Sequence, residues 1–178
     1  MLEWDGRESY RNIVYKVTWA LAKVSQMGIH YEYLIKADDD SFINVANLDM
    51  TLAGLDPQTM IYGGECLLNK EVQRKGKYKV GLDEYSDKTY PGYAAGAGYV
   101  LSKPLVDLIL QRMWRVEQFR VEDAFIGYVI SLFDVEPVCW DTFFHRHWEE
   151  YCGEVRSAVV LHYVKPEEQI IITKLISS

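Results

Sequence analysis

Three consecutive carboxylates follow an apolar run in the stretch YLIKADDDSFIN, residues 33–44. The run before them, Tyr33–Ala37, is rich in Tyr, Leu and Ile and predicts a strand. In open α/β sheets, ligands bind beyond the carboxyl ends of the strands, which is where this triplet falls. Side chains of an extended segment alternate, so we expect Asp38 and Asp40 on one side and Asp39 on the other.

The pair Asp38 and Asp40 predicts a site for a hard divalent cation. Mg²⁺ and Mn²⁺ are held by one or two carboxylates together with phosphate oxygens of a substrate. A calcium loop is excluded, because an EF-hand starting at Asp38 needs glycine at its sixth position, where Ile43 stands. The simpler alternative is an acidic loop that caps the following helix, and the triplet alone does not decide between the two.

A second unusual stretch is YPGYAAGAGYVLS, residues 90–102. Its small residues allow a backbone to approach a ligand closely, with Tyr90, Tyr93 and Tyr99 as flat walls. It lacks the third glycine of a dinucleotide fingerprint, so a nicotinamide site does not fit. The structural alternative is a tight strand packed under a helix.

Two more carboxylates, Glu122 and Asp123, open a predicted helix. Acidic residues in a first helical turn are favoured by the helix dipole, which is one sufficient explanation. The functional explanation is a general base: a carboxylate that faces a pocket can accept the proton of an attacking hydroxyl.

The overall pattern predicts one α/β domain, residues 1–178, with a mixed sheet flanked by helices. Hydrophobic periodicity and turn residues predict helices at 8–27, 44–54, 102–113 and 121–132, and strands at 31–37, 60–64, 135–140 and 158–163. Residues 67–88 are charged, broken by glycine, and predicted to be a mobile excursion. The chain opens in a helix, which predicts that an N-terminal portion is missing.

Composition excludes several classes of protein. The chain has 49% hydrophobic residues, enough for a core, and a net charge of −7 without a Lys/Arg block, which argues against nucleic-acid binding. No run approaches the roughly 18 consecutive apolar residues of a membrane span, and the N-terminus is too polar for a signal peptide. The three cysteines do not fix a redox compartment.

Four separated stretches together resemble one family. In chain order, YLIKADDDSFIN, YPGYAAGAGYVLS, VEDAFIG and VVLHYVKPEE look like motifs of the β1,3-galactosyltransferase family, glycosyltransferase family 31, which includes β1,3-N-acetylglucosaminyltransferases and is related to Fringe. RESYRNIVYKV at residues 7–17 resembles the helix before the family's DxD strand. The resemblance implies a GT-A fold and a protein that resides in the Golgi. The family's N-terminal nucleotide-binding strands and its membrane anchor have no counterpart in this sequence.

The resemblance also implies an activity and its cofactor. It predicts an inverting transfer of galactose or N-acetylglucosamine from a UDP-sugar to a glycan hydroxyl, forming a β1,3 linkage. Asp38 and Asp40 match the DxD positions that hold Mn²⁺ (or Mg²⁺), and His162 matches the histidine that completes the metal site. Asp39 falls near the donor ribose or sugar, and Lys36 matches the basic position before the motif.

The same resemblance assigns the reacting carboxylate. Asp123, with Glu122 beside it, matches the catalytic position, and Gly96 and Gly98 are expected to line the donor-sugar or acceptor pocket. One departure is Ala94, where the family often has a cysteine, so a disulfide expected there cannot form. This departure and the missing start support an alternative, a catalytically inactive GT-A-like binding or scaffolding module.

Two other interpretations start from residue types. A metal-dependent phosphoryl-transfer enzyme would need a phosphate-cradling loop of the G-x-x-x-x-G-K-[ST] kind, which is absent from the sequence. Cys139, His145, His147 and Cys152 have the chemistry of zinc ligands but not a standard finger spacing. In an oxidising compartment we expect instead a Cys139–Cys152 disulfide that leaves Cys66 free.

Overall fold

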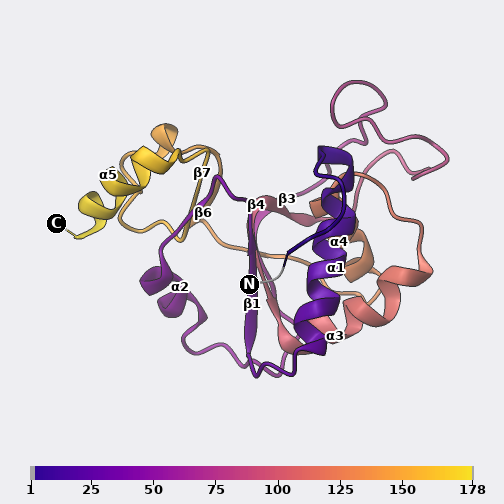
Figure 1. Cartoon of the computed structure of the whole chain (residues 1–178), viewed down its shortest axis with the longest axis horizontal. Helices are drawn as coiled ribbons and strands as arrows, with labels where there is room; N and C mark the ends of the chain where they lie inside the picture. Colours follow the sequence, from indigo (N-terminus) through magenta and orange to yellow (C-terminus); the bar gives the residue numbers. More distant parts are fainter. Residues whose placement is uncertain (1–2, 178) are drawn as a thin grey trace.

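The computed structural model describes residues 3–177, which form a mixed α/β fold with two mixed sheets flanked by helices (Figure 1). The first sheet contains, in spatial order, β1 (Tyr33–Ala37), β4 (Tyr93–Ser102), β3 (Tyr62–Leu67) and β5 (Val138–Cys139). The second contains β2 (Phe42–Ile43), β7 (Val160–His162) and β6 (Phe143–His147). β3 runs parallel to β5 and β6 parallel to β7, whereas the other neighbours are antiparallel.

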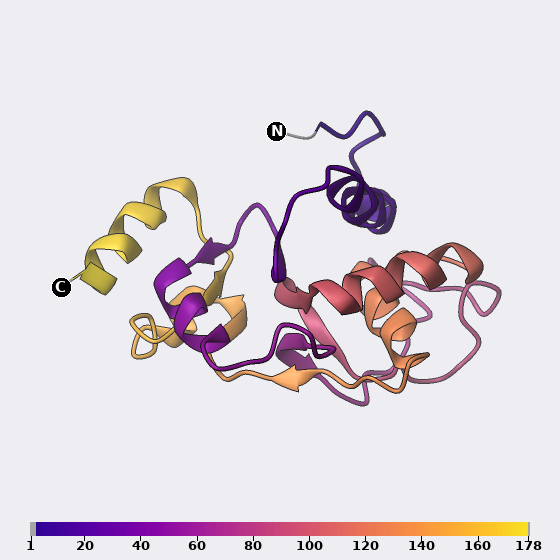
Figure 2. The same ribbon diagram turned by 90° about the horizontal axis from the view of Figure 1, so that it is seen from below.

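The helices divide between the two sheets. α1 (Ile13–Gln26), α3 (Lys103–Arg112) and α4 (Glu122–Ser131) pack on one another beside the first sheet, while α2 (Val45–Leu52) and α5 (Pro166–Ser177) lie with the second. Short 3-10 turns lie at Tyr10–Asn12, Met113–Arg115 and Trp148–Tyr151. Figure 2 separates the two halves, which β4 joins through its contacts with β6 and β7. Among residues 3–177, no helix combines the length and apolar character needed to cross a bilayer.

The predicted helices are present, and local chemistry sets their ends. Gly28 follows α1 with a φ of 65°, a backbone conformation that favours glycine. The side-chain oxygen of Asn44 caps α2 by accepting a hydrogen bond from the N–H of Asn47 at 3.2 Å. Ser102 precedes α3, but its hydroxyl accepts from the N–H of Ile61 at 2.9 Å. This serine therefore ties the end of β4 to the entry of β3 instead of capping the helix.

β4 is the strand around which the fold is built. It lies between β1 and β3 and is buried at every position except Gly96. A Cβ added at Gly98 would lie 2.9 Å from Val160, so this glycine lets β4 approach the second sheet closely. A Cβ at Gly127 would overlap Tyr93, so α4 lies directly on β4. These two contacts bring β7 and α4 close to β4, with which β1 pairs directly.

The strands differ from prediction more than the helices do. The predicted α/β class, with a mixed sheet flanked by helices, is confirmed, but the strands form two sheets, and β6 lies where no strand is predicted. The strand expected at 135–140 is reduced to the two residues of β5, and the one expected at 60–64 is displaced to β3. Local sequence does not predict short strands of this kind, because they form only by pairing with other strands: β6 pairs with β7, and β5 pairs with β3.

The long connection between β3 and β4 is organised around one side chain. The guanidinium of Arg74 donates to the carbonyls of Val80, Gly81 and Tyr85 at 2.8–3.1 Å and to that of Asp87 at 2.7 Å. These donors add to backbone pairing within the connection, where Glu71 forms an antiparallel bridge with Thr89. The connection therefore has internal order that its composition does not predict.

The disulfide pairing differs from the expected one. Cys66 on β3 is bonded to Cys139 on β5, and Cys152 is a free, exposed cysteine. The predicted Cys139–Cys152 bond is therefore wrong. The cause is the parallel pairing of β3 with β5, which places Gly64 opposite Cys139 and so brings Cys66 within reach.

Candidate functional site

A cavity of about 590 Å³ opens where β4, the turn after β1, the start of α4 and the end of β7 meet. It is lined by every residue predicted as a catalytic, metal-ligating or donor-binding residue except Gly98. These residues are Lys36, Asp38, Asp39, Asp40, Gly96, Glu122, Asp123 and His162. Chain segments more than 100 residues apart in sequence thus contribute side chains to one cavity.

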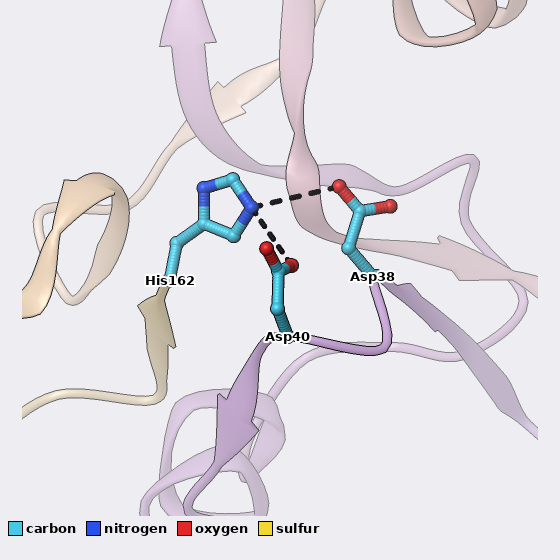
Figure 3. A group of neighbouring side chains, drawn as sticks. All are labelled: Asp38, Asp40 and His162. Carbon is cyan, nitrogen blue, oxygen red and sulfur yellow. Dashed lines mark ion pairs between the residues drawn. The ribbon is translucent and has the colours of Figure 1, made fainter. Parts of the chain in front are cut away.

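Asp38, Asp40 and His162 form one cluster at the cavity wall (Figure 3). The Nε2 atom of His162 lies 3.1 Å from Oδ1 of Asp40 and 3.7 Å from Oδ2 of Asp38. One ligand atom from each residue lies within 4.8 Å of the others. Among the residues that the structure describes, this is the only such group of three or more His, Cys, Asp or Glu side chains.

The chemistry of this cluster fits a hard divalent ion. An octahedral ion with bonds of about 2.1 Å places adjacent ligand atoms about 3 Å apart, close to the His162–Asp40 separation. Nδ1 of His162 lies 2.8 Å from the carbonyl oxygen of His145. A carbonyl only accepts, so Nδ1 carries a proton, and in the neutral ring this leaves the lone pair of Nε2 directed toward the aspartates. Two carboxylates and this nitrogen are suitable ligands for Mn²⁺.

Backbone contacts fix the turn that carries the two aspartates. The N–H of Asp38 donates to the carbonyl of Ala97 at 3.3 Å, and the hydroxyl of Ser41 donates to the same carbonyl at 2.7 Å. On the other side, the N–H of Val164 donates to the carbonyl of Asp40 at 2.8 Å. The turn is therefore attached both to β4 and to the segment that follows β7.

Lys36 connects this cluster to the carboxylates of α4. Its Nζ lies 2.6 Å from Oδ1 of Asp38, 2.6 Å from the carbonyl oxygen of Gly96 and 3.2 Å from Oε2 of Glu122. Burial lowers the pKa of Lys36, but the negative charges of Glu122 and Asp38 outweigh it and raise the pKa above its ordinary value. Lys36 is therefore a fixed positive charge between two groups of acids.

Glu122 and Asp123 are adjacent in sequence but differ in their surroundings. Glu122 is 6% exposed; its Oε1 accepts from the hydroxyl of Tyr99 at 2.6 Å, and Lys36 contacts its Oε2. Tyr99 is itself fully buried, so it is not the flat cavity wall that we expected. Both oxygens of Glu122 are thus engaged by the protein, which suits a supporting carboxylate.

Asp123 lines the cavity with its carboxylate at the start of α4. Its Oδ2 accepts from the N–H of Gly96 at 3.0 Å and its Oδ1 from its neighbour Ala124 at 2.9 Å. Burial first, and the charge of Glu122 second, raise the pKa of Asp123 from 3.8 to about 6. A carboxylate with a raised pKa at a cavity wall has the properties of a general base.

The remaining predicted residues separate into two groups. Asp39 is exposed and lines the cavity, and Gly96 lies beneath Asp123. Gly98 instead packs against Val160, away from the cavity lining. The zinc interpretation loses its ligand set, because Cys139 is in the disulfide.

Sequence reasoning missed the opposite wall of the cavity. Tyr10 and Tyr78 meet edge to face there, with ring centroids 5.4 Å apart, and Nζ of Lys77 lies 5.1–5.2 Å from both ring centroids. Two of these residues belong to the connection between β3 and β4, for which composition predicts a mobile excursion. The feature of the sequence that could have indicated this wall is the tyrosine of that connection, which stands among lysines.

Comparisons with known proteins give consistent results. A protein-family model described as Galactosyltransferase matches residues 1–140. The chain is 29% identical over its full length to a rat UDP-GlcNAc:betaGal beta-1,3-N-acetylglucosaminyltransferase 7, covering 47% of that protein. It is 28% identical over 96% of its length to a human UDP-GalNAc:beta-1,3-N-acetylgalactosaminyltransferase 1, covering 53%. Over 92% of its length it is 27% identical to the Arabidopsis thaliana hydroxyproline O-galactosyltransferase GALT2, covering 24%. The chain thus spans about half the length, or less, of these relatives.

Proposed function

Because the chain belongs to the galactosyltransferase family, we propose that it carries the catalytic site of an inverting, Mn²⁺-dependent glycosyltransferase. The proposed reaction moves galactose or an N-acetylhexosamine from a UDP-sugar to a hydroxyl of a glycan acceptor and forms a β1,3 linkage. One observation carries the proposal: the Asp38, Asp40 and His162 cluster and the Asp123 carboxylate line the same cavity. A bound diphosphate and a reacting hydroxyl need this combination of groups.

In the proposed reaction, the cavity residues have separate roles in metal binding, proton transfer and positioning. Asp38, Asp40 and His162 would hold Mn²⁺, which supplies a Lewis acid for the charge that develops on the departing UDP. Asp123 accepts the proton of the acceptor hydroxyl as that oxygen attacks the anomeric carbon. Displacement by a single attack inverts the anomeric centre, so one base is sufficient. Glu122 and Lys36 hold the backbone and charges around Asp123 in place.

Nucleotide binding by this chain is expected to depend on Mn²⁺. In calorimetry, UDP should bind in the presence of Mn²⁺ and lose at least tenfold in affinity with EDTA, because carboxylates alone repel a diphosphate. The Asp40→Asn variant should bind UDP weakly in both conditions, while an Asp134→Asn variant, changed on the turn after α4, should match the wild type. Equal UDP affinity with Mn²⁺ and with EDTA would contradict the metal assignment.

The donor sugar is best determined by a hydrolysis and transfer screen. The relatives above are named for transfer of N-acetylglucosamine, N-acetylgalactosamine or galactose. UDP-galactose, UDP-N-acetylglucosamine, UDP-N-acetylgalactosamine and UDP-glucose should therefore be compared in the presence of Mn²⁺. Mn²⁺-dependent UDP binding without turnover of any donor would favour the inactive binding module instead.

The rate of transfer is expected to rise with pH as Asp123 ionises. Only the ionised carboxylate accepts a proton, and its pKa is raised to about 6. kcat/KM should therefore fall about tenfold per pH unit below that value and level off above it. The measurement needs saturating Mn²⁺ at each pH, so that metal loading stays constant. A flat profile between pH 5 and 7 would show that a group with this pKa is not the base.

A further inference from the structure

Two irregularities in the sheets face each other behind the metal-ligand cluster. The register of β3 against β4 shifts between Gly64 and Cys66, which releases Glu65 from the ladder. The register of β6 against β7 shifts between Phe144 and His147, the stretch that contains His145. Bulges of this kind redirect side chains, and they are common beside functional sites. Glu65 and His145 are the residues that meet across the gap.

Glu65 holds His145 at two points. Its Oε2 accepts from the backbone N–H of His145 at 2.6 Å. Its Oε1 lies 2.6 Å from Nδ1 of the same histidine, a contact that is an ion pair only when the ring is protonated and whose direction does not make a hydrogen bond. A residue whose amide and ring both contact one carboxylate has little freedom to rotate about its backbone. The carbonyl of His145 is consequently fixed in direction.

That carbonyl accepts the proton on Nδ1 of His162 at 2.8 Å. The hydrogen bond selects the tautomer of His162 and turns its Nε2 toward Asp40 and Asp38. Glu65 does not line the cavity, whereas His145 and His162 do. Glu65 is therefore the outermost member of a chain of contacts that ends at the candidate metal ligand.

We propose that Glu65 is a positioning residue for metal binding: through His145 it fixes the tautomer and ring orientation of His162. The inference rests on the proposed function in taking His162 as a metal ligand. Outer-shell partners of this kind commonly contribute about 10–100-fold to metal affinity when they orient a ligating histidine. No contact between Glu65 and the ion or the substrate is needed.

The test compares variants of Glu65 with two measurements on the whole chain. ¹⁵N NMR of the metal-free protein reads which ring nitrogen of His162 carries the proton, with the signal assigned by its loss in His162→Gln. Titration with Mn²⁺ alone reads metal affinity. Glu65→Ala should give a mixture of His162 tautomers and an affinity about 10–100-fold lower. Glu65→Gln, which keeps an oxygen for the amide of His145, should restore most of both.

The control is a second glutamate beside a histidine. Glu149→Ala removes an exposed carboxylate 3.9 Å from Nδ1 of His147, and it should change neither measurement. If Glu65→Ala does not fold, Glu65→Asp takes its place, because its shorter side chain stops short of the amide of His145 and should also give mixed tautomers. Wild-type tautomer and affinity in the folded Ala or Asp variant would overturn the inference. A wild-type chain without Mn²⁺ affinity would contradict the proposed function, while the NMR comparison would still decide the role of Glu65.

Discussion

Asp123→Asn is expected to lower the transfer rate by about 10²–10⁴-fold while Mn²⁺-dependent UDP binding stays at the wild-type level. The amide keeps the shape of the carboxylate and can still accept from the N–H of Gly96, but it cannot take up a proton from the acceptor hydroxyl. The change should therefore appear in kcat, with little effect on donor KM. The assay is radiolabelled or coupled transfer with the preferred donor, beside calorimetry with UDP and Mn²⁺.

Loss of folding is not expected to explain that loss of activity. The pKa of Asp123 is raised in the folded chain, so the native state binds its proton more tightly than the unfolded state does. The contribution of this group to the free energy of unfolding is therefore lost as pH rises from about 4 to about 6, and its charged form destabilises the folded state at pH 7. Asp123→Asn removes that charge and should be at least as stable as the wild type at pH 7 in urea unfolding.

A control substitution at another carboxylate distinguishes loss of the base from a general effect of removing a carboxylate. Asp107→Asn changes a half-exposed partner of Lys103 on α3, outside the cavity lining, and should leave turnover unchanged. If Asp123→Asn keeps its turnover, the base lies elsewhere, and Glu122 is the first residue to examine. The surroundings of Glu122 argue against it, because Glu122 is only 6% exposed and is paired with the charged ammonium of Lys36, whereas Asp123 is partly exposed and accepts only from backbone N–H groups.

The different surroundings of Glu122 and Asp123 show what sequence can and cannot predict. Two neighbouring residues in a first helical turn point in directions about 100° apart, but the pattern does not reveal which direction faces a cavity. That direction is set by how α4 lies on β4, which Gly127 and Tyr93 determine. The sequence predicts that a carboxylate at this helix end could act as a base. Only packing distinguishes the partly exposed carboxylate of Asp123 from the buried one of Glu122, which Tyr99 and Lys36 engage.

The same limit applies to the strands and the metal-ligand cluster. Periodicity predicts the long helices, whereas the spacing of Asp38 and Asp40 leaves both a cation site and a helix cap open. β6 has the sequence FFHRH, without the alternation that marks a strand, and owes its existence to pairing with β7. The residue type of His145 makes it a candidate zinc ligand in the sequence. Its contact with Glu65 is not visible there, since 80 residues separate the two in the chain.

The disulfide is the feature on which the largest stability effect is expected. Cys139→Ser should lower the free energy of unfolding by about 2–4 kcal/mol, because the bond closes a long loop and so restricts the unfolded chain. The sequence separation of the two cysteines is 73 residues. Cys139 is exposed, so the serine loses little packing and the effect reports the cross-link. Urea unfolding of both proteins at one pH gives the difference.

Two controls isolate the bond from the substitution. Cys152→Ser changes a free, exposed cysteine and should leave the unfolding curve unchanged. Dithiothreitol should move the wild-type curve to that of Cys139→Ser and leave the variant where it is. Equal curves for wild type and Cys139→Ser without reductant would show that Cys66 and Cys139 are not cross-linked in the folded chain.

The cross-link also has a local consequence, because it anchors the shortest strand of the first sheet. In the strand pairing, β5 is aligned with β3 only at Gly63 and Gly64, and the N–H of Trp140 donates to the carbonyl of Gly64 at 2.9 Å. Cys66 directly follows Glu65, so loosening β5 also loosens the bulge from which Glu65 reaches His145. Cys139→Ser should therefore weaken Mn²⁺ binding by a smaller factor than Glu65→Ala does, whereas Cys152→Ser should not weaken it at all.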